Sequence, residues 1–123
     1  MKKSLFVLAL MCVSLVAFCQ SSTNWKELDD YKQLITKMAA AADRNDFQPA
    51  RDNAADLLAK AKVLMNATPP NATMSVAIKA LTRRLYAESA GVNAAVGMKK
   101  PEPDLKNTIV KANNTYLEIV KKL

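Results

Sequence analysis

The stretch "DRNDFQPARDN", residues 43–53, lies between two long segments whose apolar residues recur at alternating intervals of three and four positions. This spacing places apolar side chains on one face of an α-helix. The stretch itself is rich in polar residues that favour turns and helix caps. Pro49 is compatible with the first turn of a following helix, where no internal hydrogen bond is lost. We therefore predict that residues 43–53 contain the turn of a helical hairpin.

The helices on either side of this turn are predicted over about residues 24–44 and 47–65. The stripe of the first helix is Leu28, Tyr31, Ile35, Met38 and Ala42, and that of the second is Ala50, Ala54, Leu57, Ala61 and Leu64. Asn24 and Asp46 are the expected N-caps, because short polar side chains accept hydrogen bonds from the free N–H groups of the first turn.

Two more helices are predicted after "NATPPNAT", residues 66–73, whose prolines interrupt the pattern. The third runs over about residues 73–96, and we expect Gly97 to end it in the left-handed conformation. The fourth runs from the expected cap Asp104 to about Lys122. The stripe of the third helix is Met74, Ile78, Leu81, Leu85, Val92 and Val96, and that of the fourth is Leu105, Ile109, Ala112, Tyr116, Ile119 and Leu123.

Four helices of about twenty residues with short connections pack most simply as an antiparallel up-down four-helix bundle. No period-2 strand pattern competes with this all-α interpretation. The 18 alanines that follow residue 19 favour helix and let neighbouring helices approach closely. We assign residues 20–123 to one such domain.

The first 19 residues have the pattern of a secretory signal peptide. "MKK" is a short basic segment, and residues 4–18 form an apolar segment that is too short for a stable membrane anchor. Cleavage is expected between Cys19 and Gln20, which predicts a periplasmic or secreted protein without thiols. A lipoprotein acylated at Cys19 is the alternative, although Phe18 is bulky for the position before the modified cysteine. An uncleaved signal anchor is a further alternative.

Positive charge is concentrated in the second half of the chain. Without Lys2 and Lys3, 16 basic side chains face 11 acidic ones, a net charge of +5. Residues 20–66 hold seven of each sign, whereas residues 67–123 hold nine basic and four acidic side chains. This basic half is suited to an anionic surface or partner, or simply to solubility. With few aromatic residues among the basic ones, nucleic acid is not an expected partner.

The side chains available exclude much familiar chemistry. The chain has no histidine and only two glycines, Gly91 and Gly97, so catalytic Ser–His or Cys–His pairs and phosphate-cradling glycine loops are absent. Asp52 and Asp56 lie one helical turn apart, but two carboxylates alone make a poor cation site. Methionines such as Met38 or Met98 could ligate haem or copper, but core filling is the more common role. We therefore assign no catalytic, cofactor-binding or metal-binding residue.

Two stretches carry a resemblance to a known group of proteins. They are "YKQLITKMAAAADRNDFQPARDNAADLLAKAKVL", residues 31–64, and "LKNTIVKANNTYLEIVKKL", residues 105–123. Together they resemble an uncharacterised family of small exported bacterial four-helix-bundle proteins, similar in architecture to cytochrome b562 and cytochrome c′. Six residues of this chain match that family's pattern, namely Tyr31, Pro49, Leu57, Tyr116, Glu118 and Ile119.

The departures from this pattern bear on function. The family often carries histidine pairs in its first and last helices, which implies a metal or haem site. This chain has Lys32, Ala40, Asn113 and Leu117 at those positions, none of them a good ligand. The resemblance therefore implies that the scaffold is kept and the site is lost.

The sequence favours an exported, non-enzymatic bundle with a binding or structural role in the cell envelope, as a monomer or homodimer. Its expected partner is an envelope protein or an anionic surface, and no cofactor is expected. The alternative is a cytochrome-like bundle that holds haem or metal through methionine, tyrosine or carboxylate ligands.

Overall fold

A computed structural model of the chain describes residues 25–69 and 75–123. The predicted signal peptide and its cleavage position at Cys19 and Gln20 lie outside these residues. So does Met74, which was expected on the stripe of the third helix.

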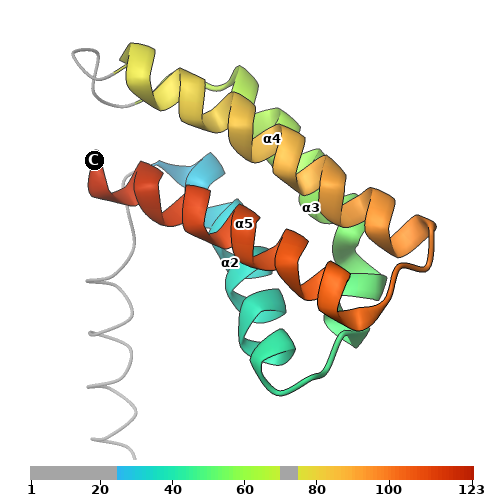
Figure 1. The fold of residues 1–123 in the computed structure, drawn as a ribbon. Helices are drawn as coiled ribbons and strands as arrows, with labels where there is room; N and C mark the ends of the chain where they lie inside the picture. Colours follow the sequence, from blue (N-terminus) through green and yellow to red (C-terminus); the bar gives the residue numbers. More distant parts are fainter. Residues whose placement is uncertain (1–24, 70–74) are drawn as a thin grey trace, which may run out of the picture.

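The structure is a bundle of four helices that alternate in direction (Figure 1). They are α2 (Lys26–Asp43), α3 (Gln48–Asn66), α4 (Ser75–Gly97) and α5 (Glu102–Lys121). The α2–α3 turn and the α4–α5 turn lie at one end of the bundle, and α2 begins close to where α5 ends at the other. The predicted all-α four-helix bundle is confirmed.

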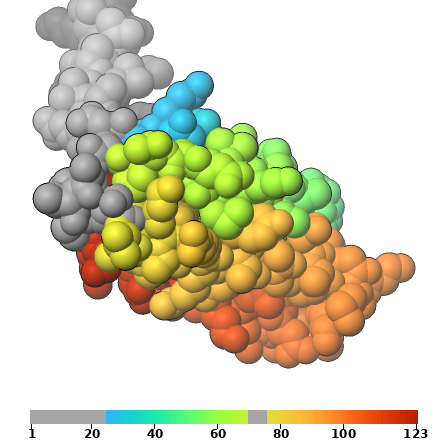
Figure 2. Space-filling model, turned by 90° about the horizontal axis from the view of Figure 1, so that it is seen from above, coloured from blue at the N-terminus to red at the C-terminus, as the bar shows by residue number. Residues whose placement is uncertain are grey.

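Each helix packs against two neighbours, in the cyclic order α2, α3, α4, α5. The space-filling view shows α4, in yellow to orange, lying against both α3, in green, and α5, in red (Figure 2). The buried face of each helix is the stripe that the three-and-four spacing predicts, because this spacing keeps apolar side chains on one side of a helix. The largest fully buried side chains include Tyr31, Leu28, Ile35, Met38, Leu57, Leu64, Ile78, Leu85, Leu105, Ile109 and Ile119.

Several predicted helix ends are wrong by one or two residues. Trp25, not Asn24, occupies the N-cap position of α2, and Phe47, not Asp46, that of α3. The carboxylate of Asp46 still accepts a hydrogen bond from the N–H of Gln48 at 3.1 Å. Asp46 therefore satisfies one free N–H of the first turn of α3, although it lies one residue before the N-cap Phe47.

The α4–α5 connection differs most from its prediction. Helix α5 begins at Glu102, and Asp104 lies within its first turn instead of capping it. Pro103 can stand in that turn because no intrahelical partner exists for its missing N–H. Gly97 remains helical, and the left-handed residue is Lys99, with φ of 52°.

The ends of two stripes also differ from the prediction. Leu123 lies beyond the last helical residue and is exposed, although its spacing places it on the α5 stripe. Val96 is only partly buried, at the edge of the core. Within residues 25–69 and 75–123, no helix combines the length and the apolar composition that crossing a bilayer requires.

Candidate functional site: a basic pocket beside the α4–α5 turn

A pocket of about 360 Å³ opens to solvent beside the α4–α5 turn. Three of the six side chains that line it are cationic, namely Arg51 from α3 and Lys99 and Lys100 from the turn. Ala95, Val96 and Leu105 supply the apolar part of its wall. The pocket therefore joins three of the four helices at the end of the bundle where both turns lie.

The backbone of the turn holds Lys99 and Lys100 in place. The N–H of Lys99 donates to the carbonyl of Val96 at 3.1 Å, and the N–H of Lys100 donates to the carbonyl of Ala95 at 2.9 Å. This pair of bonds is a Schellman motif, in which the residue after the C-cap adopts the left-handed conformation. That residue is usually glycine, because a Cβ atom in this conformation costs roughly 1–2 kcal/mol. Lys99 occupies the position despite this cost.

Arg51 reaches the pocket from the second turn of α3. Its Nη2 lies 3.8 Å from Oε2 of Glu102, and both side chains are about half exposed. This separation is long for a charge-assisted hydrogen bond, which is typically about 2.7–2.9 Å. The ion pair is therefore loose, and the guanidinium retains donors for another acceptor.

These features define what the pocket can do chemically. Three cations and one nearby carboxylate leave a positive excess, and the lining residues carry no carboxylate, thiol or hydroxyl. Arginine can bind two oxygens of a phosphate or carboxylate at once, and lysine adds a mobile point charge. The site is suited to holding an anion that also has an apolar part.

A second polar region lies at the centre of the bundle. The Ser89 hydroxyl donates to the carbonyl of Leu85 at 2.7 Å, so the Tyr31 hydroxyl, 2.8 Å away, must donate to Ser89. Burial raises the pKa of Tyr31 far above its ordinary value, and the charge of Glu88 adds to this effect. Tyr31 is therefore a neutral donor that links α2 to α4 diagonally across the core.

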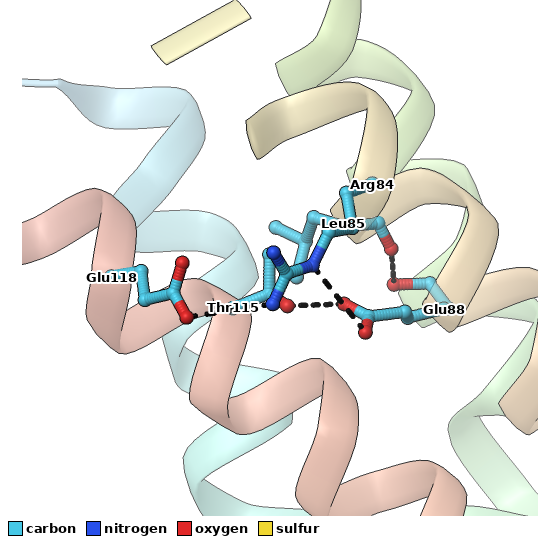
Figure 3. A network of polar contacts seen from close by, with 6 residues as sticks. Arg84, Leu85, Glu88, Thr115 and Glu118 are labelled. Atoms are coloured by element: carbon cyan, nitrogen blue, oxygen red, sulfur yellow. Dashed lines mark hydrogen bonds and ion pairs between the residues drawn. The ribbon is translucent and has the colours of Figure 1, made fainter. Parts of the chain in front are cut away.

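The neighbouring contacts extend this layer to the surface (Figure 3). The Thr115 hydroxyl donates to Oε1 of Glu88, which ties α5 to α4. The guanidinium of Arg84 lies between two carboxylates, with Nε 3.8 Å from Glu88 Oε2 and Nη2 3.4 Å from Glu118 Oε1. Arg84, the cation of this network, already faces two acids, so the network fits a structural role better than a binding one.

The two carboxylates considered from the sequence as a cation site lie on the solvent-exposed side of one helix. Asp52 and Asp56 are both exposed on α3, and Asp52 accepts a hydrogen bond from Nε2 of Gln48 at 2.8 Å. In the described part of the chain, no three acidic or cysteine side chains are close enough to hold a metal ion.

The methionines and aromatic residues considered as ligands lie in different surroundings. Met38 is buried within the apolar core, and Met98 is exposed at the α4–α5 turn. Tyr31 and Tyr116 pack against each other with ring centroids 6.3 Å apart. Burial raises the pKa of Tyr116, and the charge of Asp29 raises it further.

The four positions at which the resembled family carries histidines are not core positions in this bundle. Ala40 and Leu117 are exposed, and Lys32 and Asn113 are half-buried. Searches of protein-family models, curated proteins and solved structures find no match to this chain. The resemblance therefore stays an expectation from the sequence.

Lys99 and Lys100 are adjacent in the sequence, whereas Arg51 has no basic neighbour there. Arg51 lies in the half of the chain with balanced charge, 48 positions before Lys99. One signal could have found it. In an up-down bundle the first and third turns share an end, so basic residues close to those two turns are expected to converge.

Proposed function

We propose that this chain is an exported, non-enzymatic binding protein that attaches to an anionic component of the cell envelope through its basic half. The observation that carries the proposal is the pocket in which Arg51, Lys99 and Lys100 surround an apolar wall. An excess of positive charge around a concave site attracts anions and favours their capture.

The distribution of charge supports the same proposal. Helices α4 and α5 and their turn carry the whole positive excess of the exported chain. Among the residues that the structure describes, the ion pairs in this half involve Arg84, Glu88, Glu102 and Glu118, whereas Lys99, Lys100 and Lys111 are exposed. A bound anion would find these lysines available.

The competing haem or metal site has less support from the geometry. A tyrosine ligates a metal ion as its phenolate, yet the Tyr31 hydroxyl is neutral and donates to Ser89. Met38 packs among apolar side chains in the core. The exposed Met98 would have to bind at the surface, and the lining of the neighbouring pocket holds no methionine or cysteine.

Washing envelopes of the host cell with increasing salt tests the proposal. We expect the protein to remain with the envelope pellet at low ionic strength and to be released as salt rises, because salt screens attraction between exposed charges. Neutralising Arg83 and Lys111 together, as Arg83→Gln and Lys111→Gln, should lower the salt concentration needed for release.

Two outcomes would overturn the proposal. Release at every salt concentration would mean that charge does not hold the protein at the envelope. Retention at every concentration would indicate a covalent lipid on Cys19. Native mass spectrometry of the protein purified from the envelope reports the N-terminus in either case, and an added mass equal to haem or a metal would favour the competing function.

A further inference from the structure

We infer that the pocket beside the α4–α5 turn binds the phosphate headgroup of an anionic lipid, and that this phosphate displaces Glu102 from Arg51. The inference rests on the proposed function, since it names the anion and the residues that hold it. Arg51, Lys99 and Lys100 are its expected ligands.

The dimensions of the pocket suit a headgroup. Its volume of about 360 Å³ lies at the small end of the range of ligand sites, which is roughly 300–1,000 Å³. An acidic polypeptide would require an extended groove with repeated cations. Here the three cations converge on one place from α3 and the α4–α5 turn.

The Arg51–Glu102 pair provides an exchange mechanism. At 3.8 Å between Nη2 and Oε2, with both side chains about half exposed, the pair contributes little by itself. A phosphate offers two or more oxygens to the guanidinium in a bidentate arrangement, together with a larger charge than one carboxylate. Glu102 therefore holds Arg51 near the pocket and is readily replaced.

Lys99 supports the inference from its backbone. A lysine at φ of 52° keeps a local conformational cost that glycine would remove. Residues held in sparsely populated conformations gather at functional sites. Lys99 is one of the residues that line the pocket. A requirement for positive charge there would explain a lysine at a position where the backbone favours glycine.

Apolar features of the same turn favour a lipid over a free phosphate. Met98 is 67% exposed and immediately precedes Lys99, and Val96 and Leu105 form part of the pocket wall. The α4–α5 turn, in orange, projects from one end of the molecule (Figure 2). A projecting turn with both cations and an exposed apolar side chain fits a membrane interface, where headgroup phosphates lie next to acyl chains.

Co-sedimentation of the full exported protein with vesicles tests this inference. The vesicles consist of phosphatidylcholine alone or mixed with phosphatidylglycerol, whose headgroup carries a net negative charge. We expect Arg51→Gln and Lys99→Gln each to lower the partition coefficient for the mixed vesicles about tenfold, as loss of a charge-assisted contact implies.

Matched variants separate the pocket from general charge. Arg83→Gln and Lys111→Gln remove the same charges from exposed positions outside the pocket lining, and we expect at most about a threefold loss from each. Glu102→Gln should raise the partition coefficient about threefold by freeing Arg51. The matched control is Glu118→Gln, which removes the same charge from the ion pair with Arg84. It should raise the partition coefficient by less than Glu102→Gln does, because Arg84 does not line the pocket.

Three results would overturn the inference. Equal losses for pocket and control variants would show that charge acts without the pocket. Equal partition into both kinds of vesicle would exclude the anionic lipid, while salt-dependent retention in host envelopes would leave the proposed function standing. Binding of inorganic phosphate or polyglutamate that Arg51→Gln abolishes, without vesicle binding, would assign the pocket to a soluble phosphate or an acidic polypeptide.

Discussion

The two turns at one end of the bundle share a layout but not a chemistry. Residues 44–47 connect α2 to α3, and residues 98–101 connect α4 to α5, four residues in each case. In both turns, the next helix begins three residues after the residue in the left-handed conformation. The second residue of that helix is a proline, Pro49 in α3 and Pro103 in α5. The same pair of Schellman hydrogen bonds closes both preceding helices.

The residues placed on this shared backbone differ at each position. The left-handed residue is Asn45 in the first turn and Lys99 in the second. Asparagine visits this conformation more readily than lysine, because its short polar side chain can hydrogen-bond locally. The next position holds Asp46, whose carboxylate binds the N–H of Gln48, whereas the second turn has Lys100 there. The first turn is thus suited to folding and the second to presenting charge.

The largest expected difference between the turns concerns the residue just before the next helix. Phe47 is buried in the core, whereas its counterpart Pro101 is exposed. We expect Phe47→Ala to lower the free energy of unfolding by about 3–5 kcal/mol, the usual cost of a large-to-small change in a core. Pro101→Ala should cost at most about 1 kcal/mol. Urea unfolding measures both, and similar losses from the two variants would contradict the division of roles.

The central layer provides a region against which the turns can be compared. The folded-state pKa values of Tyr31 and Tyr116 are raised, so the folded chain retains phenol protons that the unfolded chain loses. Stability should therefore be complete below about pH 10 and fall as pH rises, by up to about 1.4 kcal/mol per pH unit for each tyrosine.

Tyr31→Phe tests this expectation in alkaline urea titrations. The variant should flatten the decline above about pH 10, and near neutrality it should cost about 1 kcal/mol for the lost hydrogen bond to Ser89. Asn45→Gly, which leaves the central layer intact, is the control and should keep the wild-type slope. A Tyr31→Phe slope equal to the wild-type one would rule out this residue as a source of alkaline unfolding.

The buried stripes could be predicted from the sequence because burial follows helical periodicity over many residues. Every stripe position of α2 and α3 is buried as expected. The ends of the helices are harder to predict from the sequence, because several local preferences compete within one turn. Near α5, Asp104 favours a cap, yet Pro101 and Pro103 allow the helix to begin at Glu102. Near α4, Gly97 favours the left-handed position, yet the helix continues to it and Lys99 adopts that conformation.

The basic pocket could be predicted only in part. Lys99 and Lys100 stand out in the sequence as a pair beside prolines. Arg51 does not, because its importance depends on the antiparallel packing that brings α3 to the α4–α5 turn. The Tyr31–Ser89 hydrogen bond likewise joins residues 58 positions apart, and no spacing rule within one helix indicates it.

Exchanging the left-handed residues for glycine tests the comparison more finely. Lys99→Gly should raise the free energy of unfolding by about 0.5–1 kcal/mol, because the relief of the Cβ clash exceeds the entropy cost of glycine. Asn45→Gly should change it by a few tenths of a kcal/mol. If binding explains the lysine, the more stable Lys99→Gly variant should also partition less into phosphatidylglycerol vesicles. A stabilised variant with undiminished partition would separate the backbone cost from function.

The smallest difference in stability between the two turns is expected at the residues that directly follow the left-handed ones, Asp46 and Lys100. Asp46→Ala should lower the free energy of unfolding by about 0.5–1 kcal/mol, because the N–H of Gln48 loses its acceptor. Lys100→Ala should stay within about 0.5 kcal/mol of the wild type, as is usual for exposed side chains. Thermal unfolding of the two variants at matched ionic strength resolves this difference. A cost for Lys100→Ala equal to that of Asp46→Ala would mean that the second turn also depends on its side chains for folding, and its lysines would then need no ligand to explain them.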